Sequence, residues 1–368
     1  MVYLDNGATS YPKPDCVCQA VSKAMAECAN PGRGSHPAAR AGAQVLYQCR
    51  EAAGALFRCS PEQVVFTMNC TQGLNMAIRT LVKPGMKVAV SGFEHNAVTR
   101  TLHGLGARMM VAGRRLFWPE DTLEEFDACL RRGAQAAVFT HVSNVFGYIL
   151  PIEQMAQMCR RRGVPFIIDA AQSAGALPLD VQALGADFIA MPGHKGLLGP
   201  MGTGLLLCRR LPRPWLTGGT GSESLRQQMP DFLPDRGEAG TMNVPGIAGL
   251  DAGIRYVLER TPAQIGLAEQ QMAALAARRL RDLGLEVFSG DHQLGTVSFR
   301  CAMDCEQAAS LLAQEGIAVR AGLHCAPLAH RSAGTLDTGT VRISFGHDAS
   351  QAQVDALEHA AAARLCPV

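Results

Sequence analysis

The chain has 368 residues, of which 48% are hydrophobic and 18% charged, and its formal net charge is +2 at pH 7. This composition is typical of a globular protein, and the small net charge gives no reason to expect nucleic acid or an anionic membrane as a partner. No apolar stretch approaches the roughly 20 residues of a membrane span, and the first residues do not resemble a signal peptide. We therefore expect a soluble, cytoplasmic protein.

The 13 cysteines are odd in number and scattered through the chain, which does not resemble a disulfide framework and suits a reducing compartment. The closest spacings are Cys16 with Cys18 and Cys301 with Cys305. Neither is a paired CxxC motif, so no metal site is expected. Most of the cysteines are expected to be small, buried hydrophobic residues.

Short apolar runs alternate with helical patterns through the first 250 residues. A strand and a proline-bearing turn at residues 11–14 open the chain, and helical stretches include 73–82 and 153–162. The runs predicted to be strands are 64–67, 88–90, 109–111, 137–140, 166–168, 188–190 and 205–207. Continuous apolar runs indicate strands that are covered on both faces. The pattern predicts an α/β fold with a mostly parallel central sheet and helices on both faces.

The pattern changes after about residue 250. A helical stretch covers 247–283 with a break near Thr261, and a helix over 304–315 separates strand-like segments at 296–299 and 341–345. This part is predicted to form a smaller α+β domain. We expect a large domain over 13–250, and a small domain made of 1–12 and 251–368.

Two segments that follow apolar runs contain candidate catalytic residues. Asp169 follows the strand at 166–168, and Lys195 stands in a glycine-rich turn after the strand at 188–190. A lysine can form a Schiff base with the aldehyde of pyridoxal 5′-phosphate (PLP), and an acid can hold the pyridine nitrogen protonated. Alternatively, Asp169 caps a helix and Lys195 is simply solvated. The chain lacks the glycine signatures of a dinucleotide fold or a P-loop, which disfavours both.

Three further strand ends offer polar groups. Residues 67–73 combine a hydroxyl-rich turn with a helix start, which is suited to a phosphate, although Thr71 could instead cap the helix. His95 could stack on a pyridine ring or be an ordinary loop histidine. The Asn144 amide could reach the phenolic oxygen of the cofactor.

Taken together, these motifs resemble the cysteine desulfurase and selenocysteine lyase family, which has the class V aminotransferase fold (PLP-dependent transferase fold type I). The matching segments occur in the order of the family: residues 3–9, 30–36, 94–96, 141–144, 169–172, 193–195 and 238–241. The resemblance implies a PLP enzyme that acts on L-cysteine or L-selenocysteine.

The resemblance also implies a role for each matching residue. Lys195 would carry the cofactor and move the α-proton, Asp169 would contact the pyridine nitrogen, and His95 would stack on the ring and take part in catalysis. The remaining implied cofactor contacts are Gln172 and Asn144 near the phenolic oxygen, and Cys70, Thr71 and His194 around the phosphate. Thr241 would reach the phosphate of a partner subunit's cofactor, which implies a homodimer.

One cysteine stands apart from the other twelve. Cys325 lies in a loop with glycine and proline, beside His324 and near Arg320, surroundings that can favour a thiolate. The resemblance implies that this thiolate attacks the sulfur of the substrate, takes it as a persulfide and releases alanine. Arg342 would bind the substrate carboxylate as a planar fork. Arg320, Arg33 and Asn144 are further candidates on the substrate side.

Some alternatives stay open. The protein could be a selenocysteine lyase, an epimerase or transaminase of the same fold in which Cys325 is not catalytic, or a non-catalytic scaffold. The short spacing from Cys325 to Arg342 resembles the family branch with a compact catalytic loop, which favours a partner protein that accepts the sulfur. Three positions depart from the usual family residues, namely Gly7, Pro192 and Leu323. Because of these departures, the resemblance does not decide the branch of the family or the preferred substrate.

Overall fold

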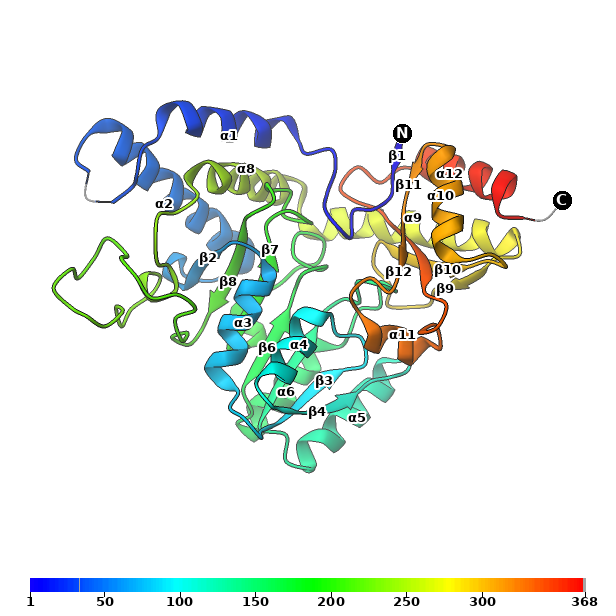
Figure 1. Cartoon of the computed structure of the whole chain (residues 1–368), viewed down its shortest axis with the longest axis horizontal. Coiled ribbons are helices and arrows are strands. Elements are labelled where there is room, and N and C mark those ends of the chain that lie inside the picture. Colours follow the sequence, from blue (N-terminus) through cyan, green and yellow to red (C-terminus); the bar gives the residue numbers. More distant parts are fainter. Residues whose placement is uncertain (33, 367–368) are drawn as a thin grey trace.

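The computed structural model describes residues 1–32 and 34–366, and its strands form two main sheets (Figure 1). The larger sheet has seven strands in the order β2-β8-β7-β6-β5-β3-β4. These are β2 (Val64–Thr67), β3 (Lys87–Ser91), β4 (Arg108–Ala112), β5 (Ala136–Thr140), β6 (Phe166–Asp169), β7 (Phe188–Pro192) and β8 (Gly204–Cys208). Each apolar run predicted to be a strand in the first 250 residues therefore forms one.

Most neighbouring strands of this sheet are parallel, as predicted. The pairs β4–β3, β3–β5, β5–β6 and β6–β7 are parallel, whereas β8 runs antiparallel to both β7 and β2. An apolar run carries no information about strand direction, so the sequence did not distinguish β8 from the others. Residues 193–203 connect β7 to β8 without a crossover helix, which suits an antiparallel connection.

Helices cover both faces of the seven-stranded sheet. They are α1 (Asp15–Glu27), α2 (Pro37–Phe57), α3 (Cys70–Leu81), α4 (Asn96–Gly104), α5 (Pro119–Arg131), α6 (Ile152–Arg162) and α7 (Val181–Leu184), with short 3-10 turns at Pro61–Gln63 and Asp235–Gly237. Alternate residues of β6 separate the two faces: Phe166 and Ile168 belong to one buried cluster, and Ile167 belongs to the other. No helix among the described residues is both long enough and apolar enough to cross a membrane.

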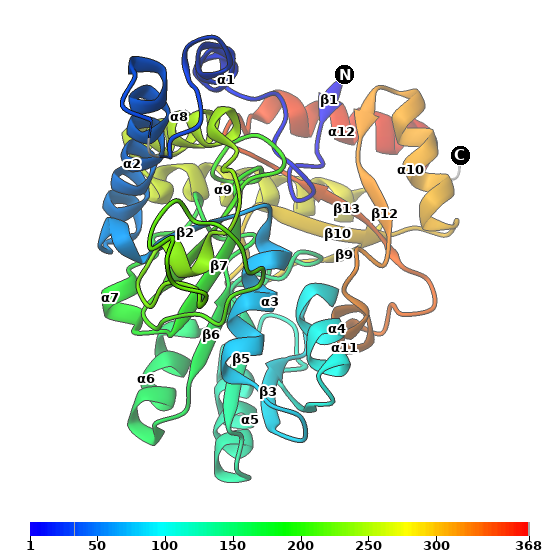
Figure 2. The same ribbon diagram turned by 60° about the vertical axis from the view of Figure 1, so that its left-hand side comes forward.

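The second sheet is antiparallel, with the order β12-β13-β10-β9. Its strands are β9 (Glu286–Phe288), β10 (Thr296–Arg300), β12 (Arg320–Gly322) and β13 (Thr340–Ser344). The remaining helices are α8 (Val244–Arg260), α9 (Pro262–Asp282), α10 (Cys305–Gln314), α11 (Pro327–Ala333) and α12 (Gln351–Arg364). A two-stranded parallel ribbon joins β1 (Val2–Tyr3) to β11 (Ile317–Ala318), so the N-terminus lies beside the C-terminal part of the chain (Figure 2).

The predicted break in the long helical stretch is at Thr261. This residue ends α8 and begins α9, with φ of 63°, and its side chain accepts a hydrogen bond from the backbone N–H of Gln264. Helix α8 runs across the boundary expected at residue 250 and packs against α1 and α2. The backbone therefore changes direction about ten residues after the expected boundary.

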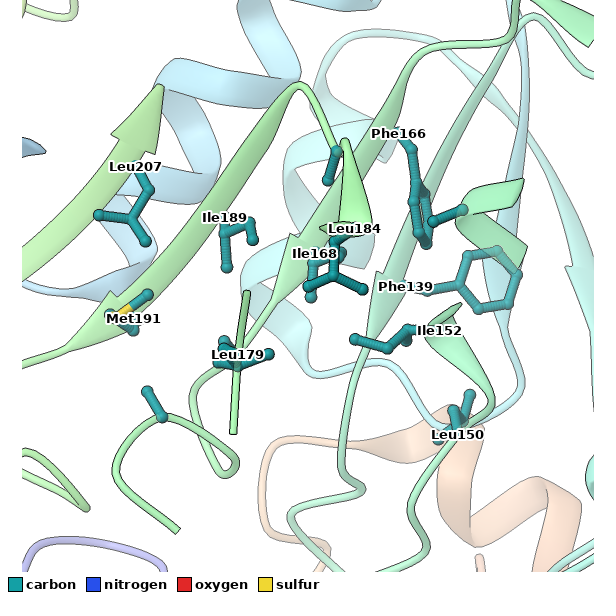
Figure 3. Packing of buried hydrophobic residues seen from close by; sticks show 14 of the residues in the cluster. Phe139, Leu150, Ile152, Phe166, Ile168, Leu179, Leu184, Ile189, Met191 and Leu207 are labelled. Carbon is teal, nitrogen blue, oxygen red and sulfur yellow. The ribbon is translucent and has the colours of Figure 1, made fainter. Parts of the chain in front are cut away.

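The largest buried cluster lies between the seven-stranded sheet and the helices on one of its faces (Figure 3). Phe139 on β5 is fully buried, with its ring centroid 5.0 Å from that of Phe126 and 6.3 Å from that of Phe166. Edge-to-face contacts of this kind add to the hydrophobic gain from burial. The ring of Phe139 thus packs α5 against β5 and β6, two neighbouring strands that end at polar residues of the site.

We predict that Phe139→Ala destabilises the protein by about 3–5 kcal/mol, because it leaves a cavity where an aromatic ring was fully buried. The midpoint of urea unfolding is measured by circular dichroism, with the wild type and the variant in the same cofactor state. Leu267→Ala, on the exposed side of α9, is the matched control and is expected to shift stability by less than about 0.5 kcal/mol. Equal midpoints for the two variants would contradict the prediction.

Candidate active site

The carboxyl ends of the parallel strands open onto one cavity. Ligands of open α/β sheets bind at this edge because loops there diverge to either face. Eight of the residues predicted to contact the cofactor line the cavity together: Cys70, Thr71, His95, Asn144, Asp169, Gln172, His194 and Lys195. They come from the ends of five different strands, namely β2, β3, β5, β6 and β7, so it is the sheet that brings them together.

Asp169, the last residue of β6, is 2% exposed. Its Oδ1 accepts hydrogen bonds from the backbone N–H of Ala171, at 2.9 Å, and from the thiol of Cys70, at 3.4 Å. Burial raises the pKa of the Cys70 thiol, so the thiol keeps its proton and can donate. Oδ2 has no partner within the described chain. A turn follows Asp169 instead of a helix, so the helix-cap alternative is wrong, and a buried carboxylate with one free oxygen fits a pyridinium nitrogen.

Lys195 lies in the turn that follows β7. This turn approaches another backbone segment closely: a Cβ on Gly196 would lie 2.3 Å from the carbonyl oxygen of Ala174, and Gly175 opposite it has φ of 90°. Only glycine fits both positions. The side chain of Lys195 is partly buried and lines the cavity. Desolvation, followed by the charge of Arg342, lowers the pKa of its amine to about 8. Lys195 therefore lies in a cavity, not on an open surface as the solvated-lysine alternative required.

The N-terminus of α3 has the features of a phosphate cradle. Asn69 caps the helix, accepting a hydrogen bond from the Gln72 N–H at 2.9 Å. Thr71 is therefore not the cap, and its hydroxyl is available to a ligand. Within the described residues the backbone N–H groups of Cys70 and Thr71 have no acceptor, and such groups at a helix N-terminus favour anions.

His95 caps α4, and its Nδ1 accepts a hydrogen bond from the Ala97 N–H at 3.0 Å. The proton of the neutral ring is thereby assigned to Nε2. Burial lowers the pKa of the imidazole, which favours the neutral form. The preceding residue, Glu94, is fully buried, and its Oε1 accepts from the N–H groups of Ser91 and Thr140. This carboxyl joins the ends of β3 and β5 and so fixes the turn that presents His95.

Arg342 on β13 is 2% exposed and reaches the same edge from the second sheet. Its Nη1 donates to the carbonyl of Asn144 at 3.0 Å, and its Nη2 donates to Oδ1 of Asp5 at 2.7 Å. Arg320 also contacts Asp5, with Nη2 2.8 Å from Oδ2, but half of its side chain is exposed. No role was predicted for Asp5 from the sequence, although it lies in the N-terminal motif, where an acid follows a short strand.

The loop that carries Cys325 is tied to the cavity by two hydrogen bonds. The side-chain amide of Asn144 donates to the carbonyl of His324 at 2.8 Å, and the backbone N–H of Asn96 donates to the carbonyl of Cys325 at 2.7 Å. Both loop residues have positive φ, 49° for His324 and 57° for Cys325. Non-glycine residues rarely adopt this conformation, and it persists only where surrounding contacts enforce it. The side chain of Cys325 is exposed.

Thr241, predicted to contact a cofactor phosphate, lies away from this cavity. Thr241 is exposed and lines a different hollow, next to Glu238, whose carboxylate accepts from the Phe66 N–H at 2.7 Å and pairs with Arg50. Arg33 lies outside the described residues. Among the residues that are described, no three His, Cys, Asp or Glu side chains are placed to hold a metal ion.

Comparisons with known proteins agree with this geometry. The aminotransferase class-V family model matches residues 2–357. A probable cysteine desulfurase from Pyrococcus abyssi is 32% identical over 94% of this chain and 89% of its own length. A cysteine desulfurase from Haloferax volcanii is 28% identical over 97% of this chain and 88% of its own.

Solved structures give the same result. The apo structure of a cysteine desulfurase from Thermococcus onnurineus has a TM-score of 0.91 and 29% identity, covering 99% of this chain and 94% of that one. A cysteine desulfurase from Escherichia coli has a TM-score of 0.85 and 27% identity, covering 100% and 95%. The chain therefore belongs to the aminotransferase class-V family, and these relatives and solved structures are named cysteine desulfurases.

Proposed function

We propose that this protein is a PLP-dependent cysteine desulfurase, which converts L-cysteine to L-alanine and leaves the sulfur as a persulfide on Cys325. The observation that carries the proposal is the pair of hydrogen bonds that tie the Cys325 loop to the rim of the cavity containing Lys195 and Asp169. An epimerase or transaminase needs the lysine and the acid, but has no use for an exposed thiol held at that rim. The similarity to proteins named cysteine desulfurases supports the same activity.

The described residues offer each part of PLP a partner. Oδ2 of Asp169 would contact the pyridine nitrogen, His95 would cover the ring, and the N-terminus of α3 with Thr71 and His194 would hold the phosphate, which their position around one cavity supports. Gln172, whose amide donates to the Gly7 carbonyl at 3.0 Å, and Asn144 remain for the phenolic oxygen. When bound through Lys195, PLP supplies an electron sink that stabilises negative charge on the α-carbon of the substrate.

Lys195 then moves the α-proton. An amine with a pKa of about 8 is roughly one-tenth neutral at pH 7, far more than an ordinary lysine, so it can accept a proton and later return it. The charge of Asp169 partly offsets the effect of burial on this pKa, because a nearby anion favours the protonated amine. Lys195 can thus both hold and release a proton at the cavity.

Arg342 and Cys325 act at opposite ends of the substrate. Arg342 presents a planar fork to the carboxylate. The thiolate of Cys325 attacks the substrate sulfur, so an S–S bond forms on Cys325 as the C–S bond of the substrate breaks. His324 beside the thiol is neutral because burial lowers its pKa to about 3. The exposed side chain leaves the persulfide open to a sulfur-acceptor protein, which we propose as a partner.

We also propose a cytoplasmic homodimer in which Thr241 completes the phosphate site of the partner subunit. Its exposure and its absence from the cavity of its own chain support this assignment. We further infer a large domain around the seven-stranded sheet and a small domain around the second sheet. The change of direction at Thr261 supports a boundary between the two domains near that residue. The pairing of β1 with β11 supports placing the first residues of the chain in the small domain.

We predict that Cys325→Ala binds PLP normally but releases no alanine from L-cysteine, because Cys70, the other thiol described at the cavity, has a raised pKa and donates a hydrogen bond to Asp169. Mass spectrometry of wild type after incubation with L-cysteine is expected to show one added sulfur atom on the peptide containing Cys325. Cys18→Ala, which removes an exposed thiol on α1, is the control and keeps full activity. Alanine release by Cys325→Ala at the wild-type rate would rule out the desulfurase mechanism.

A second prediction concerns pH. Only the neutral amine of Lys195 attacks an aldehyde, so the rate at which PLP attaches to the apoprotein should rise with pH, reach half its maximum near pH 8 and level off by about pH 9. An unperturbed lysine, with a pKa of 10.5, would show a rate that keeps rising beyond that point. The rate is followed by cofactor absorbance, and the attached residue is identified after borohydride reduction. A rate that still climbs steeply above pH 9 would contradict the lowered pKa.

A further inference from the structure

We infer that Asp5 is a positioning residue of the active site, which holds the guanidinium of Arg342 in the orientation that receives the substrate carboxylate. The inference rests on the proposed function, because it assigns that carboxylate to Arg342. Asp5 would orient the guanidinium of Arg342 before the substrate binds.

Asp5 and Asn144 hold two different nitrogens of Arg342. Oδ1 of Asp5 accepts from Nη2 at 2.7 Å, and the carbonyl of Asn144 accepts from Nη1 at 3.0 Å. The side chains of Arg342 and Asp5 are 3% and 10% exposed. Water therefore cannot easily replace either anchor, and the direction in which the free N–H groups point depends on these two contacts.

The backbone beside Asp5 limits the guanidinium further. A Cβ on Gly7 would lie 3.2 Å from Cζ of Arg342 and 3.4 Å from Nη2, so the chain passes close to the guanidinium. The N–H of Gly7 donates to Oγ of Ser344 at 2.7 Å, which fixes this segment to β13. Residues 5–7 thus form one wall of the arginine's surroundings, and only Asp5 in this wall contributes a charge.

Charge balance also assigns a role to Asp5. Its Oδ2 accepts from Nε and Nη2 of Arg320, at 3.0 and 2.8 Å, so one carboxylate is shared by two guanidinium groups. The three side chains carry a net charge of +1, which one substrate carboxylate would neutralise. Burial disfavours the charged form of Arg342, and Asp5 counters this effect. Without Asp5 the buried cation would keep a single anchor, and a buried charge without a partner is costly.

Two effects of removing Asp5 oppose each other. The local charge becomes more positive, which favours a carboxylate, but Arg342 loses the contact that aligns it. We expect misalignment to dominate, because recognition by a planar fork depends on the direction of its N–H groups. The alternative role for Asp5 is purely structural, fastening β1 to the second sheet. A structural role would lower stability without changing how the enzyme distinguishes carboxylates.

The test compares Asp5→Asn with wild-type holoenzyme. We expect the KM for L-cysteine to rise about tenfold, corresponding to the loss of one charge-assisted alignment, with kcat within about threefold. Binding of the product L-alanine, titrated through the absorbance of the bound cofactor, should weaken by about the same factor. L-alaninamide has no carboxylate, and its binding should change by less than about twofold. Asp5→Glu keeps the charge and should fall between wild type and Asp5→Asn.

Asp15→Asn is the matched control, since it removes an exposed acid from the first turn of α1, and it should leave all of these quantities unchanged. An unchanged KM for Asp5→Asn, or equal weakening of L-alanine and L-alaninamide, would overturn the inference. If the wild type released no alanine from L-cysteine, the proposed function would fail instead. The titrations of L-alanine against L-alaninamide would still decide the role of Asp5.

Discussion

The register of three parallel strands determines the geometry of the site. Thr140 on β5 pairs with Asp169 on β6, and Asp169 pairs with Ala190 on β7, so the strands end at nearly the same level. The turn carrying Lys195 therefore begins beside the carboxylate of Asp169. A slip of one residue would exchange the faces of β6 and point this carboxylate away from the cavity. The buried aromatic residues on β5 and β6 oppose such a slip, because it would move them out of the core.

The sequence predicted most of the strands and most of the residues in the cavity. Apolar runs located the strands because both faces of this sheet are covered, and polar residues at strand ends marked the cavity. The antiparallel direction of β8 was not predictable, because an apolar run does not encode direction. The roles of Asp5 and of the Asn144 amide were also missed. They depend on contacts between residues 337 and 180 positions apart in the sequence.

The loop that carries Cys325 is held by contacts between parts of the chain that belong to the two sheets. The loop belongs to the segment after β12, but its backbone carbonyls are bound by Asn96 and Asn144 from the larger sheet. Two consecutive residues with positive φ cost conformational energy, which these contacts offset. These contacts restrict the backbone that carries the Cys325 thiol. A small change in how the two sheets pack would therefore move the thiol relative to Lys195.

The N-terminal ribbon has a consequence for how the enzyme forms. Asp5 leaves the ribosome 337 residues before Arg342, yet the two are direct partners. Their contact closes a loop of this length, and closing long loops is slow relative to forming local structure. The seven-stranded sheet is complete in the sequence by residue 208. The part of the site that would hold the cofactor can therefore form during synthesis, while the arginine that would recognise the substrate gains its partner only once β13 has been made.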